Sequence, residues 1–194
     1  MLTNPEDSSQ PADICQSPPA AADGGDRPSQ LLGAFIDYLR ARPSSGDSDS
    51  TRFDDGGSEL EGVIRGISEL GGVPVITLEP QVGCPDRTVL YFHGGGYVSG
   101  SPPERYLPLA AAVALAANAR VHVVDYRLAP QTPFPGAFDD CRHAYHWLVM
   151  RGGADPRTLV VLGDSAGGNL AVAVTAAALN QGLALPVRIA RSRR

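Results

Sequence analysis

From residue 60 onward, the apolar positions switch repeatedly between short unbroken runs and longer segments with helical spacing. Three short runs predict buried strands, and a segment of helical period follows each one. These pairs are strand Thr88–Phe92 with helix Glu104–Ala117, strand Arg120–Asp125 with helix Gly136–Met150, and strand Thr158–Leu162 with helix Ala166–Gln181. Strands that alternate with helices predict a mostly parallel sheet with helices on both faces, which is an α/β fold.

Two further segments differ from this pattern. Val63–Ser68 and Val73–Leu78 are split by Gly71-Gly72, which predicts an antiparallel hairpin at the start of the sheet. Residues 1–59 are rich in Pro, Ser, Asp and Gly, so we expect a largely disordered leader. One short helix is predicted inside it over residues 31–41, because Leu32, Phe35, Ile36 and Leu39 share one helical face. The chain thus divides into a leader and a domain over residues 60–194.

Composition narrows the class of protein. Hydrophobic residues make up 43% of the 194 residues and charged residues 19%, which is ordinary for a globular protein. The net charge is −5, and eleven of the 21 acidic residues lie in residues 1–60 beside only four of the 16 basic ones. An acidic leader on a nearly neutral body predicts no nucleic-acid partner and no anionic membrane partner.

Cysteine content and the start of the chain bear on location. The three cysteines, Cys15, Cys84 and Cys141, have no paired spacing, which argues against a disulfide framework or a zinc site. The first ten residues lack a basic segment followed by an apolar one, so no secretory signal is expected. We therefore predict a cytoplasmic protein.

The strongest indication of chemistry is Gly163-Asp164-Ser165-Ala166-Gly167, which lies directly between a predicted strand and a predicted helix. G-x-S-x-G in this context is typical of a nucleophile elbow, where a sharp turn exposes the serine hydroxyl at the end of the sheet. The alternative is a glycine-rich turn that only joins a strand to a helix. We interpret Ser165 as the nucleophile.

A second glycine-rich segment, His93-Gly94-Gly95-Gly96-Tyr97, follows the strand Thr88–Phe92. Consecutive glycines allow backbone amides to approach a ligand closely, as an oxyanion hole requires. The alternative is a phosphate-binding loop, but neither G-x-G-x-x-G before a helix nor a Gly-Lys-Ser/Thr ending is present. We expect the amides of Gly94, Gly95, Gly96 and Ala166 to stabilise an oxyanion.

Together these motifs resemble those of the hormone-sensitive-lipase-like esterases, a family of α/β-hydrolases. Asp125-Tyr126-Arg127-Leu128-Ala129-Pro130 adds to the resemblance, although Gln131 stands where the family usually has Glu. The resemblance implies hydrolysis of small-molecule carboxylic esters through an acyl-enzyme, without metal or organic cofactor. It also implies that Asp125 and Arg127 form a structural ion pair, and that the 31–41 helix is the remnant of a cap.

The rest of a catalytic triad is missing from the sequence. In this fold the acid and the histidine follow the serine, yet no Asp, Glu or His follows Ser165. His93 belongs to the glycine loop and His122 to a strand, while His143 and His146 lie off the apolar stripe of their helix, so none is expected to act as base. Triad-deficient enzymes retain about 10³–10⁴-fold catalysis over water, so poor or no activity is expected.

These absences lead to an expectation about the chain as a whole. We expect a C-terminally truncated family member whose hydrolase fold is incomplete, and whose strand Thr158–Leu162 lacks its next neighbour. Such an exposed apolar edge would favour oligomerisation or aggregation. A non-catalytic, ligand-binding homologue is the alternative function.

Overall fold

The computed structural model describes residues 60–101 and 103–192. The predicted leader, with its helix over residues 31–41, lies outside the described residues. The elements follow in the order β1 (Val63–Leu70), β2 (Val73–Pro80), β3 (Arg87–Phe92), the 3₁₀ turn η1 (Pro103–Tyr106), α2 (Leu107–Ala117), β4 (Ala119–Val124), α3 (Gly136–Met150), β5 (Leu159–Asp164), α4 (Ala166–Asn180) and β6 (Arg188–Ser192).

The six strands form one sheet in the order β1-β2-β4-β3-β5-β6. β1 and β2 form the predicted antiparallel hairpin, and β2 also runs antiparallel to β4. β4, β3, β5 and β6 are parallel to one another. Gly71 and Gly72 make the hairpin turn with φ of 64° and 83°, which a two-residue turn between twisted strands favours. The predicted α/β class and mostly parallel sheet are confirmed.

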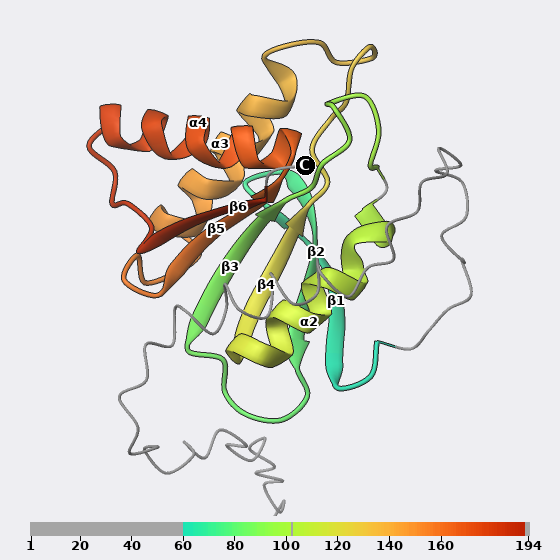
Figure 1. The fold of residues 1–194 in the computed structure, drawn as a ribbon. Helices are drawn as coiled ribbons and strands as arrows, with labels where there is room; N and C mark the ends of the chain where they lie inside the picture. The colour runs from blue at the N-terminus through green and yellow to red at the C-terminus, as the bar shows by residue number, and fades with distance from the viewer. Residues whose placement is uncertain (1–59, 102, 193–194) are drawn as a thin grey trace, which may run out of the picture.

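Helices cover both faces of the sheet (Figure 1). α2 packs on one face, where Val89, Val121 and Leu162 belong to its core cluster. α3 and α4 cover the other face, with Leu90 and Phe92 of β3 in the second cluster. α3 has the predicted bounds, and His143 and His146 are exposed on its outer side as expected.

The helix predicted over Glu104–Ala117 begins later than expected. Pro103–Tyr106 form a 3₁₀ turn, and α2 starts at Leu107. Pro108 explains the position, because proline lacks an amide hydrogen and fits the first turn of a helix, where that amide would have no partner.

The expectation that the strand at Thr158–Leu162 lacks a neighbour is wrong. β6 pairs in parallel with β5 from Val160–Arg188 to Asp164–Ser192. The pairing uses backbone groups, while the side chains of Arg188 and Arg191 stay exposed and Ala190 packs against the α2 core. An outer strand tolerates charged residues at exposed positions, so its arginines do not prevent strand formation.

The cysteine expectation also needs correction. Cys141 is free and buried in α3, whereas Cys84 is disulfide-bonded. The absence of a paired spacing in the sequence therefore did not exclude a disulfide. Within the described ranges, no helix combines the length and the apolar character needed to cross a membrane.

Candidate active site

Ser165 occupies the sharp turn between β5 and α4. Its backbone has φ 49° and ψ −117°, and its side chain is exposed. A residue other than glycine at positive φ is strained, and such strain is held in place only by the packing around it. The turn therefore presents the hydroxyl at the carboxyl edge of the parallel strands.

Two glycines flank this turn because the backbone passes too close for a side chain. A Cβ at Gly163 would overlap the carbonyl oxygen of Gly167. A Cβ at Gly167 would overlap Phe92 O and lie 2.6 Å from His93 O. The first turn of α4 is thus pressed against the end of β3, where the glycine loop begins.

Hydrogen bonds fix both the amide and the carbonyl of Gly94 in that loop. Its amide donates to Asp164 Oδ1 over 2.9 Å, and the same oxygen accepts the Tyr91 hydroxyl at 2.7 Å. Its carbonyl accepts from His93 Nδ1 at 2.7 Å and from the Tyr106 hydroxyl at 2.9 Å. The Gly94 amide, expected as an oxyanion donor, is therefore engaged by the neighbour of the nucleophile. That part of the expectation is corrected.

The next two glycines differ from Gly94. Gly95 is partly buried and Gly96 is exposed, with φ of 120° and 62°. The Gly95 carbonyl accepts from the Val98 amide at 3.1 Å and from the Ser99 hydroxyl at 3.0 Å. Among the described residues, the amides of Gly95, Gly96 and Ala166 find no hydrogen-bond acceptor. These three donors remain available to a ligand.

Tyr97 joins the glycine loop to α4. Its hydroxyl donates to Ala166 O at 3.3 Å and accepts from Asn169 Nδ2 at 2.9 Å. Its backbone has φ 66°, a second strained position beside the turn of Ser165. Sequence reasoning included neither Tyr97 nor Asn169 in the site. The only indication was the position of Tyr97 directly after the glycines.

His93 is structural. It is fully buried between Tyr126, whose ring is stacked 4.1 Å away, and Tyr106, 5.0 Å away. Burial is the main cause that lowers the pKa of His93. Its Nδ1 donates to Gly94 O, which leaves Nε2 as a buried acceptor without a partner in the described structure. A substrate at the surface cannot reach this ring.

The predicted ion pair between Asp125 and Arg127 is wrong. Arg127 instead pairs with Asp140 of α3, with Nη2–Oδ1 at 2.7 Å and Nε–Oδ2 at 2.9 Å. The Arg127 amide donates to the same carboxylate at 2.9 Å. Asp140 is only 6% exposed, so its carboxylate requires such partners, and Asp125 Oδ1 is buried without one.

A cavity of about 450 Å³ opens beside Gly96. It extends between the glycine loop, the segment before α3 and the first turns of α4. Its lining is mainly apolar, with polar groups only at Tyr97, Thr132 and Asn169; the apolar side chains are Val98, Ala129, Phe134, Pro135, Ala137, Phe138, Leu170 and Ala173. An apolar cavity beside available amides suits a small ligand that carries one polar carbonyl group.

A mostly parallel sheet with a strained serine between strand and helix, opposite a glycine loop, defines the class of α/β-hydrolases. The family model for the alpha/beta hydrolase fold matches residues 89–190, and the chain belongs to this family. Solved structures similar to the chain include a hormone-sensitive-lipase homologue and an esterase of the bacterial hormone-sensitive-lipase family.

Individual relatives agree with this assignment. The chain is 43% identical over 100 residues to an acetyl-hydrolase of Streptomyces hygroscopicus, covering 52% of this chain and 33% of that protein. It is 42% identical over 106 residues to esterase LipI of Mycobacterium tuberculosis, covering 51% and 33%. The crystal structure of EstE7, a hormone-sensitive-lipase homologue from a metagenome library, matches with a TM-score of 0.64 and 34% identity, covering 86% of this chain and 56% of that one. The chain therefore spans about a third of these curated relatives.

Proposed function

We propose that this chain carries the nucleophile and the oxyanion hole of a carboxylic ester hydrolase. Ser165 attacks the ester carbonyl, forming an acyl-enzyme and releasing the alcohol; water then releases the acid. The amides of Gly95, Gly96 and Ala166 stabilise the oxyanion of each tetrahedral intermediate. Gly94 has a supporting role in this scheme. No metal or organic cofactor takes part.

One observation carries the proposal. Ser165 is exposed in a strained turn, and its two neighbours along the chain both accept hydrogen bonds from the glycine loop. Asp164 accepts the Gly94 amide, and the Ala166 carbonyl accepts the Tyr97 hydroxyl. A turn that merely connected β5 to α4 would have no need for positive φ at a serine.

The proposed substrates are small esters with a short acyl chain. The apolar cavity beside Gly96 supports this choice, since it offers room for a small apolar group next to the proposed oxyanion donors. Two relatives, an acetyl-hydrolase and an esterase, support the same substrate class.

A general base is the missing component. All four histidines of the chain lie in the described residues, and none is placed to serve Ser165. His93 is enclosed between two tyrosines, His122 is buried within β4 and hydrogen-bonded to Thr77, and His143 and His146 are exposed on α3. We therefore propose that residues 1–194 alone react slowly, and this feature favours a non-catalytic ligand-binding homologue as the second candidate.

Labelling with a fluorophosphonate distinguishes the two. The wild-type chain and Ser165→Ala are treated with the probe, with and without added imidazole, and the labelled residue is mapped by mass spectrometry. Slow labelling of Ser165 that imidazole accelerates supports a nucleophile without its base. If imidazole leaves the labelling of Ser165 unchanged, or both variants react alike, the esterase proposal fails. Saturable binding of an ester to the chain, with no labelling of Ser165 by the probe, would support the ligand-binding candidate.

Location and association are part of the proposal. We propose a protein with no nucleic-acid or membrane partner; the disulfide at Cys84 favours an oxidising compartment over the cytoplasm expected from the cysteine spacing. The outer strands of the described sheet are β1 and β6, so association through the edge beyond β5 would involve β6.

A further inference from the structure

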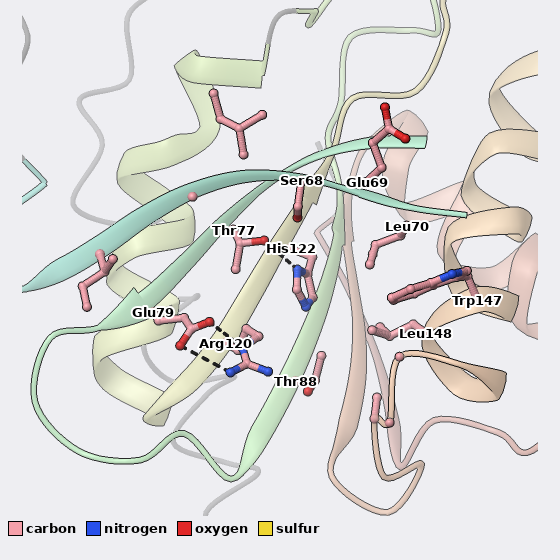
Figure 2. Close-up of a pocket in the computed structure, with 16 residues that line it drawn as sticks. Ser68, Glu69, Leu70, Thr77, Glu79, Thr88, Arg120, His122, Trp147 and Leu148 are labelled. Atoms are coloured by element: carbon pink, nitrogen blue, oxygen red, sulfur yellow. Dashed lines mark hydrogen bonds and ion pairs between the residues drawn. The ribbon is translucent and has the colours of Figure 1, made fainter. Parts of the chain in front are cut away.

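A second cavity of about 460 Å³ lies on the sheet (Figure 2). We call it the β1–β4 groove, since strands β1, β2, β3 and β4 line it together with the end of α3 and the following loop. Thr88 and Arg120, near the amino ends of β3 and β4, belong to its lining, whereas Ser165 follows the carboxyl end of β5. The groove is therefore separate from the proposed active site.

The sheet face changes character toward this groove. Side chains two residues apart on a strand share a face, so each strand can be followed along the α3 side. Toward the amino end of β4, the buried Val124 is followed on this face by His122 and then Arg120. Toward the amino end of β3, Leu90 is followed by Thr88. The described helices cover the apolar half of this face and leave the polar half open to the groove.

His122 is the central group of the groove. It is only 7% exposed, and its Nδ1 is hydrogen-bonded to Thr77 Oγ1 at 2.9 Å. Burial, with a smaller effect of Arg120, lowers the pKa of His122 to about 4, so the imidazole is uncharged at neutral pH. Its Nε2 has no protein partner in the described ranges, yet it is not sealed from solvent. A largely buried ring nitrogen in this state favours a ligand or an ordered water as partner.

The charged side chains of the groove are one ion pair and one exposed carboxylate. Arg120 pairs with Glu79 through Nε–Oε1 at 2.5 Å and Nη2–Oε2 at 3.4 Å, as Figure 2 shows. Glu69 is an exposed residue of the lining. No unpaired cation in this lining would attract an anion. The hydroxyls of Ser68 and Thr88 make no hydrogen bond to the described residues, and each can both donate and accept.

We propose that the β1–β4 groove binds a small uncharged polyhydroxylated ligand of the monosaccharide class, through His122 Nε2 and the hydroxyls of Thr88 and Ser68. Ligand hydroxyls donate and accept as these groups do, so each group can find a partner whichever way it is oriented. The cavity volume falls in the range of small-molecule sites, about 300–1,000 Å³. This proposal is independent of the esterase proposal, because the two sites share no residue.

Nuclear magnetic resonance on the ¹⁵N-labelled full chain tests this, with methyl α-D-glucopyranoside as the probe. We expect saturable shifts of the His122 imidazole nitrogens and the Thr88 amide. Thr88→Val removes one hydroxyl and suits a strand, and we expect it to raise the Kd about fivefold, as the loss of one neutral hydrogen bond predicts. Thr175→Val, the same change on α4 outside the groove, should leave the Kd unchanged.

Three results would overturn the proposal. The first is no saturation with up to about 100 mM probe, since a site of this kind should bind at millimolar affinity or better. The second is an unchanged Kd in a folded Thr88→Val variant. The third is saturable binding of acetate or methylammonium at His122 in place of the sugar. Ser165 labelling is unaffected by any of them, so the esterase proposal is tested separately.

Discussion

Replacing Asp164 should loosen the glycine loop from the nucleophile turn. Asp164→Leu keeps a similar size but removes the oxygen that accepts both the Tyr91 hydroxyl and the Gly94 amide. Tyr91 is fully buried and Gly94 is buried, so neither donor can turn to bulk water. The change therefore removes the acceptor of two hydrogen bonds in the interior.

The size of the effect follows from these two bonds. A hydrogen bond to a charged group contributes about 1.5–3 kcal/mol, and the two bonds share one acceptor, so their losses are not additive. We expect Asp164→Leu to lower the free energy of unfolding by about 3 kcal/mol. Asp164→Asn retains an acceptor oxygen and loses only the charge, so about 1 kcal/mol is expected.

Urea unfolding of the three proteins measures the stability change, and hydrogen exchange of the Gly94 amide reports on the loop itself. Asp164→Leu should accelerate exchange at Gly94 well beyond Asp164→Asn, while amides of β4 keep their order relative to one another. If Asp164→Leu unfolds within about 0.5 kcal/mol of wild type, the carboxylate does not hold the loop and the argument is refuted.

Three further changes follow from the same structure. Gly167→Ala should destabilise the fold by about 1–3 kcal/mol in urea unfolding, since its Cβ would overlap Phe92 O, whereas Gly66→Ala, with open space around it, should be near neutral; equal stabilities would contradict the close packing. Between about pH 6.5 and pH 4 the unfolded chain binds a proton at His122 and the folded chain does not, so lowering the pH through this range should reduce the free energy of unfolding by about 3 kcal/mol. His122→Gln should remove this part of the pH dependence of stability, while His93 keeps its own contribution of the same sign. Tyr97→Phe should cost about 1 kcal/mol by removing the hydroxyl between Ala166 O and Asn169, and an unchanged urea midpoint would rule out that link.

The hydrophobic pattern predicted most of the strands and helices, because burial determines which of their positions are apolar. Residues 89–92 of β3 and residues 159–162 of β5 are buried, so their apolar runs are unbroken, and the bounds of α3 were predicted correctly. β6 was missed for the opposite reason. Among residues 188–191 only Ala190 packs against the core, and the strand's pairing comes from backbone groups that a side-chain pattern does not represent.

Residue types in the candidate site could be predicted, but their partners could not. The motifs singled out Ser165 and the glycines, whereas the acceptor of the Gly94 amide depends on how β5 and the loop after β3 meet. Arg127 shows the same limit. Asp125 is its near neighbour in sequence, yet the partner is Asp140, thirteen positions away on α3.

The three consecutive glycines illustrate why a motif is not yet a mechanism, because each is small for a different reason. Position 94 requires glycine because the Asp164 carboxylate occupies the space of a Cβ, and the Gly94 amide is hydrogen-bonded to that carboxylate. Gly95 combines positive φ with a carbonyl, that of Ser99, where a side chain would be. Gly96 has open space and only its φ of 62° favours glycine. A side chain at Gly96 would therefore mainly strain the backbone, whereas one at Gly94 would separate the loop from the nucleophile turn. Of the three, the proposed oxyanion chemistry should tolerate substitution best at Gly96 and least at Gly94, although Gly94 donates nothing to the substrate.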